Sequence, residues 1–256
     1  MGWVFALKLH EMTYEEYVRR ELRTWEQAML RPPSITNRLA KSLQRRVNNL
    51  IPEKVHQVVT AGIKHMTRAV LFGAEYTTRP PVVDKNVQQR DADAQRRIEF
   101  YKKAGAAEGG VTGAGGFWFS LADFPLLLGL KLKLLYDLAA IYGHSMDDYR
   151  ERLFVLHIFQ LAFSSQQRRR EVFLQMRNWS AKDFPEDIHA FDWRTFQQEY
   201  RDYIDLAKLA QLIPLIGAAV GFVVNYRLLD KLGKTAINAY RMRWEEGKSL
   251  EQRVER

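Results

Sequence analysis

Two pairs of residues in this 256-residue chain have the spacing of metal ligands. Glu53 precedes His56 by three positions, and Glu186 precedes His189 by the same interval. Di-metal carboxylate bundles use two such pairs on helices, together with two further glutamates. One hypothesis is therefore a carboxylate and histidine di-metal protein. Against it, Glu186 and His189 follow Pro185 in a polar loop, so coincidence is favoured and we expect no cofactor.

Carboxylates close to apolar sequence are the candidates for acid–base chemistry. Glu108 lies within a glycine-rich segment, Asp123 follows it, and Asp137 lies inside the leucine-rich segment that comes next. A carboxyl group in apolar surroundings can be tuned to transfer a proton near neutral pH. A hydrolase with a polar site around Asp123 and Glu108 is thus a second hypothesis. The structural alternatives are that Asp123 caps a helix and that Asp137 pairs with Lys133, four residues earlier.

Six glycines lie between Gly105 and Gly116, a density that invites comparison with phosphate-binding loops. The lysine and the hydroxyl residue of such a loop are missing, because Gly116 and Phe117 occupy their positions. No strand pattern precedes the segment, although nucleotide-binding loops follow a strand. The favoured interpretation is a flexible or close-packed entrance to the next helix. Its expected partner is the run around Gly217 and Gly221, whose spacing lets two helices approach closely.

The chain carries a formal net charge of +9, and much of it is concentrated in one segment. Residues 31–70 contain eight basic residues and one acidic residue. Such a cluster favours anionic partners, and we expect Arg38, Lys41, Arg45 and Arg46 to contact an anionic surface. Nucleic acid is disfavoured as the partner, because few aromatic residues are interleaved with the basic ones for base stacking.

Start and stop signals define the first helices. Thr13 and Glu16 have the spacing of a capping box, which predicts a helix that begins there and ends before Pro32. The double-proline segment Thr77–Val83 is the expected linker. The following helix, residues 84–103, has few apolar positions, so we expect it to lie at the periphery.

Similar signals bound the central helices. Asp123 is the expected N-cap and Gly143 the expected C-cap of the leucine-rich helix. Ser145 and Asp148 have capping-box spacing and predict the start of the next helix. The longest uncharged apolar run, Leu212–Val224, has 13 residues. A membrane span needs about 20, so we expect no conventional span.

These elements predict an all-α fold, a multi-helix globular bundle of about eight or nine helices without period-two strand patterns. Two short apolar helices flanked by glycines are expected to pack at its centre. The expected organisation is a single domain over residues 1–256, in which residues 13–76 can form a semi-independent basic arm. Residues 247–256 are charged and expected to fray. The absence of cysteine fits a reducing compartment.

Two segments of the chain resemble the EcsC family of bacterial proteins. The first runs from Ala106 to Gly143 and combines a glycine-rich approach, Asp-Phe-Pro, a leucine-rich helix and Tyr-Gly. The second runs from Ile213 to Arg243 and begins with Ile-Pro-Leu-Ile-Gly-Ala. The resemblance implies a helical, membrane-associated accessory protein, since the family is named after a gene in an operon with an ABC transporter. It implies no catalytic residue, although Asp123 and Asn225 match polar positions of its pattern.

The leading hypothesis is a non-enzymatic protein that binds lipid or a protein partner at a membrane surface, with a membrane transporter as one such partner. We expect it in the cytoplasm, at the inner face of the membrane, in contact with anionic phospholipid. The residues expected to contact the lipid or partner are Gly113, Gly115, Gly116, Trp118, Gly217, Gly221 and Asn225. The sequence leaves the oligomeric state open.

Overall fold

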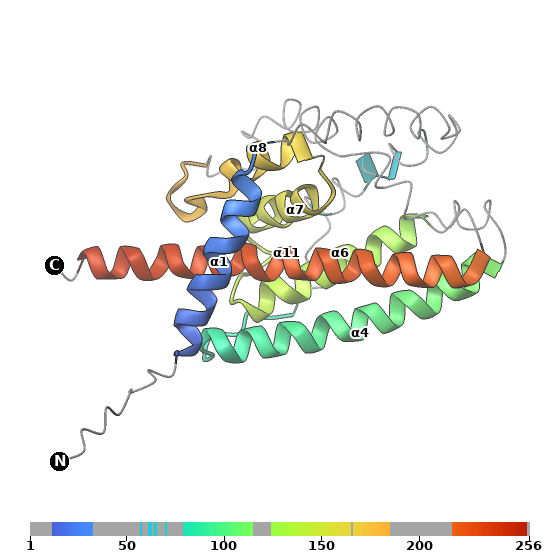
Figure 1. Ribbon diagram of the computed structural model, residues 1–256, viewed down its shortest axis with the longest axis horizontal. Helices are drawn as coiled ribbons and strands as arrows, with labels where there is room; N and C mark the ends of the chain where they lie inside the picture. Colours follow the sequence, from blue (N-terminus) through green and yellow to red (C-terminus); the bar gives the residue numbers. More distant parts are fainter. Residues whose placement is uncertain are drawn as a thin grey trace, which may run out of the picture.

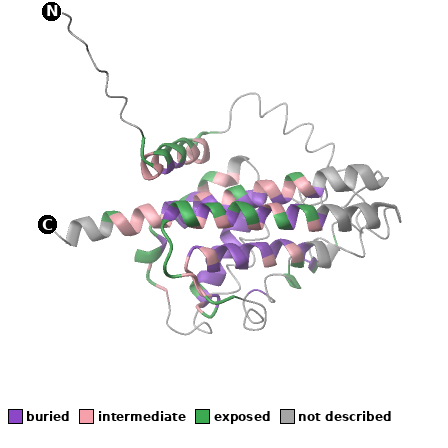
Figure 2. Ribbon diagram, turned by 90° about the horizontal axis from the view of Figure 1, so that it is seen from below, coloured by how far each residue is buried: buried purple, intermediate pink, exposed green. Residues whose placement is uncertain are grey.

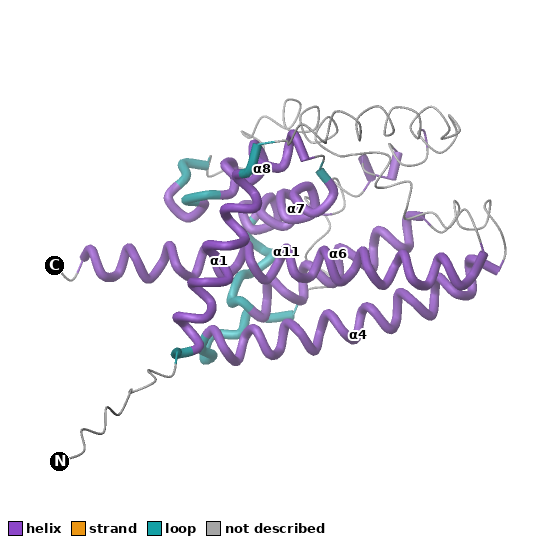
Figure 3. Tube along the Cα trace, in the orientation of Figure 1, coloured by secondary structure: helices purple, strands orange, loops and turns teal. Residues whose placement is uncertain are grey.

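The computed structural model describes residues 12–32, 57, 61–62, 64–65, 70, 79–114, 124–164, 166–184 and 217–254. Within these ranges the regular structure is helical and no β-strand occurs, which confirms the all-α class (Figure 3). The described elements are six α-helices and one 3-10 helix: α1 (Tyr14–Leu30), α4 (Val87–Ala114), α6 (Phe124–Ile141), α7 (Tyr149–Phe163), α8 (Gln166–Met176), η2 (Trp179–Ala181) and α11 (Gly217–Val254). The expected total of about eight or nine helices stays a prediction.

The two longest helices, α4 and α11, run antiparallel and side by side (Figure 1). Their register is visible in contacts between individual residues. Lys102 Nζ lies 2.9 Å from Asp230 Oδ1. A Cβ atom added to Gly105 would stand 2.6 Å from Leu229 Cδ1. Because glycine has no Cβ, the leucine side chain fills that space and the two helices approach closely.

Helix α4 belongs to the core, so the expectation of a peripheral helix is wrong. Ile98 is 1% exposed and packs against Gly233 of α11, where an added Cβ would stand only 2.5 Å from its side chain. Apart from Lys102, the buried positions recur at intervals of four and three residues: Val87, Asp91, Ala94, Ile98, Tyr101 and Gly105. This interval is typical of helices that pack along a seam. The prediction failed because aspartate, alanine and glycine hold half of these positions and give no apolar signal.

The glycine-rich segment is helical for most of its length, because α4 continues to Ala114. The sequence left a flexible entrance and a close-packed one as alternatives. At Gly105 the structure has the close-packed form, since an added Cβ would also stand 3.0 Å from Leu130 Cδ2 of α6.

Helix α6 packs against α4, α7 and α11. Its residues 134–140 are all buried, and they form part of the hydrophobic core. The expected N-cap of this helix, Asp123, lies outside the described residues.

Helix α6 is followed, as predicted, by Gly143 at the C-cap turn, with a φ of +89°. The amide of Gly143 donates to Ala140 O at 3.0 Å, and the amide of His144 donates to Ala139 O at 2.9 Å. This pair of bonds is the Schellman motif, which favours glycine because its backbone is left-handed. An added Cβ at this position would also stand 2.7 Å from Arg90 Nη1.

Helix α7 is buried along nearly its whole length, including every residue from Glu151 to Phe163. The buried residues of the described helices gather where these helices pack together (Figure 2). Its N-cap is Asp148, whose side chain accepts a hydrogen bond from the Arg150 amide. The predicted capping box with Ser145 is therefore corrected. The Ser145 hydroxyl donates to Asp147 Oδ2 at 2.8 Å and accepts from the Asp147 amide at 3.2 Å. This local turn occupies the serine and leaves the cap to the aspartate next to the helix.

Helix α1 lies across α11 and also contacts α8 (Figure 1). Its predicted capping box is confirmed, with the Thr13 amide donating to Glu16 Oε2 at 2.7 Å. Leu22 is buried, and the Trp25 ring meets the Phe173 ring of α8 edge to face, with centroids 5.5 Å apart. The division into a domain and an N-terminal arm stays a prediction.

Helix α11 runs without interruption from Gly217 to Val254. It thus includes most of the residues 247–256 that were expected to fray. None of the helices in the described ranges is long and apolar enough to cross a membrane.

Candidate functional site

Most of the site residues predicted from the sequence lie outside the described residues: Glu53, His56, Glu186, His189, Asp123, Arg38, Lys41, Arg45, Arg46, Gly115, Gly116 and Trp118. Their roles as metal ligands, catalytic group, anionic-surface contacts or lipid contacts stay predictions. In the part of the chain that the structure describes, no group of three histidines or acidic residues could hold a metal ion.

Four other candidates lie where α4 ends and α11 begins. Glu108 and Gly113 are in the last two turns of α4, and Gly217 and Gly221 are in the first two turns of α11. The antiparallel pairing brings these two helix ends together, as predicted for the two small-residue segments (Figure 1).

Asn225, predicted to contact a lipid or partner, lies inside the protein and is 1% exposed. The fully buried Lys131 of α6 has its Nζ atom 3.5 Å from Asn225 Oδ1. A buried ammonium group requires polar neighbours, because removing a charge from water is costly. Asn225 supplies one such neighbour and so connects α11 to α6.

A buried carboxylate at Asp91 of α4 connects four parts of the fold. Its Oδ2 accepts hydrogen bonds from Tyr14 OH at 2.8 Å and from Arg241 Nε at 3.0 Å. Tyr142, in the turn after α6, donates its hydroxyl to Oδ1. Burial and the hydrogen bond to Asp91 raise the pKa of Tyr14 to about 12, so Tyr14 is a neutral donor at physiological pH. We call these four residues the Asp91 cluster.

A second buried carboxylate, Asp137 of α6, faces α4. Its Oδ2 accepts hydrogen bonds from Arg97 Nε at 2.6 Å and from Tyr101 OH at 2.8 Å. Lys133 Nζ lies 3.1 Å from Oδ1, which confirms the predicted pair on one helix. The sequence placed this pair on a helix surface, but α4 covers Asp137 and leaves it 1% exposed.

A groove of about 500 Å³ opens beside Asp137. This Phe100 groove is lined by Arg79, Pro80, Val82, Lys85, Asp93, Arg96, Arg97, Phe100, Asp137, Ala140 and Ile141. Phe100 itself is 57% exposed. The Arg97 guanidinium lies over the Phe100 ring, 5.2 Å from its centroid. Asp137 thus orients Arg97, and Arg97 in turn contacts the exposed ring.

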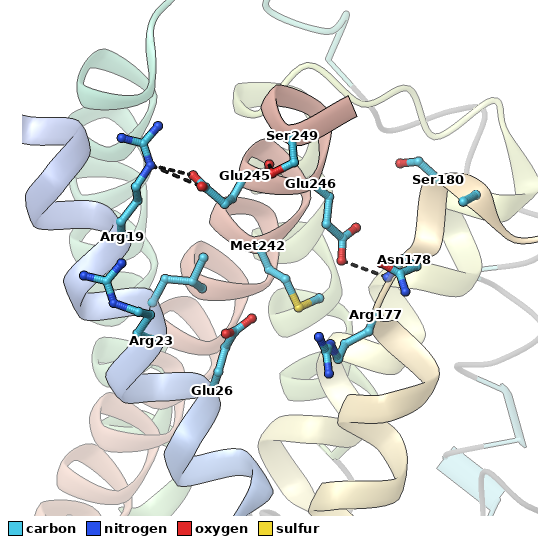
Figure 4. Close-up of a pocket in the computed structure, with 12 residues that line it drawn as sticks. Arg19, Arg23, Glu26, Arg177, Asn178, Ser180, Met242, Glu245, Glu246 and Ser249 are labelled. Atoms are coloured by element: carbon cyan, nitrogen blue, oxygen red, sulfur yellow. Dashed lines mark hydrogen bonds and ion pairs between the residues drawn. The ribbon is translucent and has the colours of Figure 1, made fainter. Parts of the chain in front are cut away.

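A separate hollow of about 440 Å³ lies between α1, the η2 segment and α11 (Figure 4). This Glu246 hollow is lined by Arg19, Leu22, Arg23, Glu26, Arg177, Asn178, Ser180, Ala181, Met242, Glu245, Glu246 and Ser249. Arg19 Nε donates to both oxygens of Glu245, at 3.1 and 3.0 Å. Glu246 Oε1 accepts from the Asn178 amide at 2.8 Å, whereas its Oε2 is buried without a hydrogen-bond partner.

Two carboxyl groups of the Glu246 hollow have raised pKa values. Burial is the main cause for both, and it raises the pKa of Glu26 and of Glu246. The charge of Glu245 adds to the shift at Glu26, and the charge of Glu26 adds to the shift at Glu246, while Arg177 opposes both. Carboxyl groups with raised pKa values in a hollow are candidates for proton transfer.

Sequence reasoning missed Asp91, Arg97 and Phe100. Phe100 is one of the few apolar residues in this helix, but its neighbours at helical spacing are Arg96 and Lys103, which mark a polar face. Asp91 could have been found from the four-and-three spacing of the seam on α4, had a polar residue been allowed at one of its positions.

The EcsC protein family matches residues 16–244, a span that contains α4, α6, α7, α8 and most of α1 and α11. The chain therefore belongs to the EcsC protein family. Protein EcsC of Bacillus subtilis (strain 168) is 43% identical over 233 residues, which cover 91% of this chain and 97% of that protein. The uncharacterized protein YdbA of the same organism is 24% identical over 249 residues, 92% of this chain and 91% of YdbA. No solved structure matches.

Proposed function

We propose that this protein acts at an anionic membrane surface, where the Phe100 groove and its rim bind phospholipid headgroups. The observation that supports the proposal is the exposed Phe100 side chain, which stands among cationic residues of α4 and of the segment before it. The role is the one expected from the sequence, and the contact residues belong to the described part of the chain.

The charge of the groove favours an anionic partner. Four of its lining residues are cationic and two are carboxylates. Asp93 already pairs with Lys85 and Arg96, and Asp137 pairs with Arg97. No carboxylate within the described ranges pairs with Arg79. The Arg96 side chain is 74% exposed, so it can reach a headgroup phosphate at the protein surface.

The apolar part of the rim favours a membrane over a soluble anion. Val83, which follows the lining residue Val82, is 76% exposed, and Phe100 is 57% exposed. Aromatic side chains are favourable at the membrane interface, and burying the exposed part of Phe100 would contribute about 1 kcal/mol. Each basic residue near an anionic surface adds about 1 kcal/mol, so several together give reversible binding.

Vesicle co-sedimentation tests the proposal. Vesicles of phosphatidylcholine alone are compared with vesicles that also contain phosphatidylglycerol, at low and high salt. We expect saturable binding to the anionic vesicles only, and loss of binding at high salt because the Debye length shortens. Phe100→Ser and Arg79→Gln should each weaken this binding about fivefold, as expected for about 1 kcal/mol per contact.

Two matched variants test the location of the contact. Leu174→Ser removes another exposed apolar side chain, on α8, and Lys234→Gln removes an exposed charge on α11. We expect both to bind vesicles within twofold of the unaltered protein. Equal loss of binding in these controls, or no binding to either kind of vesicle, would contradict the proposal.

The same surface suits an accessory protein at the inner face of the membrane. The link to an ABC transporter that the resemblance implies would then be a contact between membrane-bound partners. Co-purification from detergent-solubilised membranes, with Phe100→Ser as the comparison, tests whether a transporter is recovered with the protein. Recovery of a transporter with neither form would contradict this part of the proposal.

The Glu246 hollow favours a second candidate function, hydrolysis with a carboxyl pair as acid and base. Glu26 and Glu246 have the raised pKa values that such work requires, whereas the sequence candidates were Asp123 and Glu108. Ester, glycoside and phosphoester substrates can be screened with Glu246→Gln and with Glu245→Gln as the matched control. Turnover that only Glu246→Gln abolishes supports this candidate, and turnover that both variants retain contradicts it.

A further inference from the structure

The Glu246 hollow has groups of opposite charge on facing walls (Figure 4). Glu26 of α1 lies on one wall, and Arg177, directly after α8, lies on the other. Met242 of α11 lies between them. Three separate elements of the fold therefore bound the space in which these two charged groups stand.

Several charged groups of the hollow are already bonded within the protein. The Arg19 guanidinium donates to both oxygens of Glu245 and lies 3.5 Å from Glu15. Glu246 accepts a hydrogen bond from the Asn178 amide at 2.8 Å. These contacts join α1 and the turn after α8 to α11, so they hold the walls of the hollow in place.

Glu26 and Arg177 differ, because neither side chain forms a hydrogen bond or an ion pair with another described residue. Arg177 is exposed and Glu26 is half-buried, so both groups can be reached from solvent. Burial raises the pKa of Glu26, and the charge of Arg177 opposes this rise. The two charges are thus close enough to interact but are not in contact, which leaves a gap that a ligand can bridge.

The signs of these two charges select the class of ligand. A purely anionic ligand on Arg177 would be repelled by Glu26, and a purely cationic ligand on Glu26 would be repelled by Arg177. A ligand with both charges avoids this cost and gains a charge-assisted hydrogen bond on each wall. The volume of about 440 Å³ is ample for a small molecule, since ligand pockets span about 300–1,000 Å³.

We infer that the Glu246 hollow binds a small zwitterion, in which a primary ammonium group lies a few atoms from a carboxylate or a phosphate. The ammonium group donates to the Glu26 carboxylate, and the Arg177 guanidinium donates to the anionic group. Free α-amino acids and the phosphoethanolamine headgroup of a phospholipid both have this chemistry. The inference does not rest on membrane binding by the Phe100 groove, which shares no lining residue with the hollow, and it requires no turnover.

Calorimetric titration with matched compounds tests the need for both charges. L-Serine and phosphoethanolamine carry both, ethanolamine carries only the ammonium group, and glycerol phosphate carries only the anion. We expect at least one of the zwitterions to bind about tenfold more tightly than either single-charge compound, because each of those loses one charge-assisted hydrogen bond. Equal affinity for all four compounds would overturn the inference.

Glu26→Gln and Arg177→Gln test the location of the site. We expect the first to weaken zwitterion binding about tenfold, and the second, at a more exposed group, about fivefold. Neither substitution breaks an ion pair within the described residues, so the unfolding temperature should not fall. Burial disfavours the charge of Glu26, which makes its loss harmless to the fold.

The matched controls are Glu21→Gln on α1 and Arg170→Gln on α8. Both residues are exposed and neither lines the hollow. These variants should bind the zwitterion within twofold of the unaltered protein. The inference is overturned if Glu26→Gln and Arg177→Gln also stay within twofold, or if the controls lose as much affinity as they do.

A vesicle arm separates the two sources of the zwitterion. Vesicles of phosphatidylcholine alone are compared with vesicles that also contain phosphatidylethanolamine, because a choline group has no N–H to donate to Glu26. A preference for phosphatidylethanolamine that Glu26→Gln removes and Phe100→Ser retains indicates a headgroup. Binding of L-serine without this preference indicates a free amino acid. No binding of either soluble zwitterion and no such preference would overturn the inference, whereas loss of binding to anionic vesicles in Phe100→Ser bears only on the Phe100 groove.

Discussion

Asp91 and Asp137 are two buried carboxylates with nearly the same chemistry and different surroundings. Each is at most 2% exposed and accepts from one arginine and at least one tyrosine. The donors to Asp91 come from α1, α11 and the turn after α6, whereas the donors to Asp137 come from α4 and from α6 itself. Asp91 therefore holds the architecture together, and Asp137 positions Arg97 and Phe100 at the surface.

Burial and hydrogen bonding alone therefore do not separate a structural carboxylate from one that supports a site. What differs is the number of elements that the carboxylate connects and whether its partners reach solvent. We therefore expect substitution of Asp91 to lower the free energy of unfolding strongly. Substitution of Asp137 should lower it less and should also change vesicle binding.

The largest effect is expected for Asp91→Ala. The substitution leaves the Arg241 guanidinium, 2.9 Å from the lost carboxylate, buried without its counter-charge. Breaking a buried ion pair from one side costs about 3–5 kcal/mol. Chemical denaturation measures the loss. Asp93→Ala, which removes a more exposed carboxylate two residues away, should cost under about 1 kcal/mol. Equal losses of unfolding free energy in the two variants would show that Asp91 contributes no more to stability than Asp93.

The next largest effect is expected from a fall in pH, which should lower the free energy of unfolding through His144. Burial, with the charges of Arg243 and Arg90, lowers the pKa of His144 to about 3, against 6.5 in the unfolded chain. Unfolding therefore takes up a proton between these values, so the stabilisation is complete above pH 6.5 and decreases as the pH falls. The loss from pH 6.5 to pH 5 is about 2 kcal/mol.

Thermal unfolding at pH 7 and pH 5 checks this expectation, with His144→Gln as the comparison. The raised pKa values of Glu26 and Glu246 act with the opposite sign, because their burial favours the protonated form. The difference between the two proteins isolates the histidine. The same pH dependence in both would rule out His144 as the acid-sensitive group.

A smaller effect is expected for Asp137→Asn. Arg97 loses its counter-charge but is 20% exposed at its side chain, so water compensates in part and the cost is about 1.5 kcal/mol. The Phe100 groove becomes more positive, and binding to anionic vesicles should strengthen about fivefold. Vesicle titration alongside denaturation measures both. Weaker vesicle binding at an intact fold would show that loss of the Arg97 orientation outweighs the added positive charge.

The smallest effects are expected for the tyrosines that donate to Asp91 and to Asp137, and they distinguish the surroundings of the two carboxylates. Tyr14→Phe and Tyr101→Phe each remove one hydroxyl that donates to a buried carboxylate, at a cost of about 1 kcal/mol. Hydrogen exchange should become faster in α1 for Tyr14→Phe and in the middle of α4 for Tyr101→Phe. Faster exchange in α1 for both variants would mean that the two carboxylates belong to one cooperative unfolding unit.

The fold was predictable where a local signal decided the outcome. The capping box at Thr13 and the left-handed glycine at Gly143 each depend on a few neighbouring residues, and both were found. The start of α7 was misassigned to Ser145 because a turn two residues long competed for its hydroxyl. The position of α4 was not predictable from apolar counts, since its seam uses Asp91 and Gly105, whose burial depends on what α11 presents opposite them.

The candidate sites depended even more on tertiary contacts. Lys133 and Asp137 were paired from their spacing, but only the packing of α4 makes Asp137 a buried group. Phe100 and Ile98 are both apolar and two residues apart on α4, yet one faces solvent and the other the core. The choice between them is set by Gly233, which lies far away in the sequence and leaves room for Ile98.

The pairing of α4 with α11 also has a consequence for synthesis on the ribosome. Arg241 follows its partner Asp91 by 150 residues. At about 5–20 residues per second, the newly made α4 waits roughly 8–30 s for α11 to appear. During that interval α6 and α7, which are made first, are the elements available to cover the seam of α4. Of the described helices, α11 is the last to be translated, and it completes a core that α4 enters from the first half of the sequence.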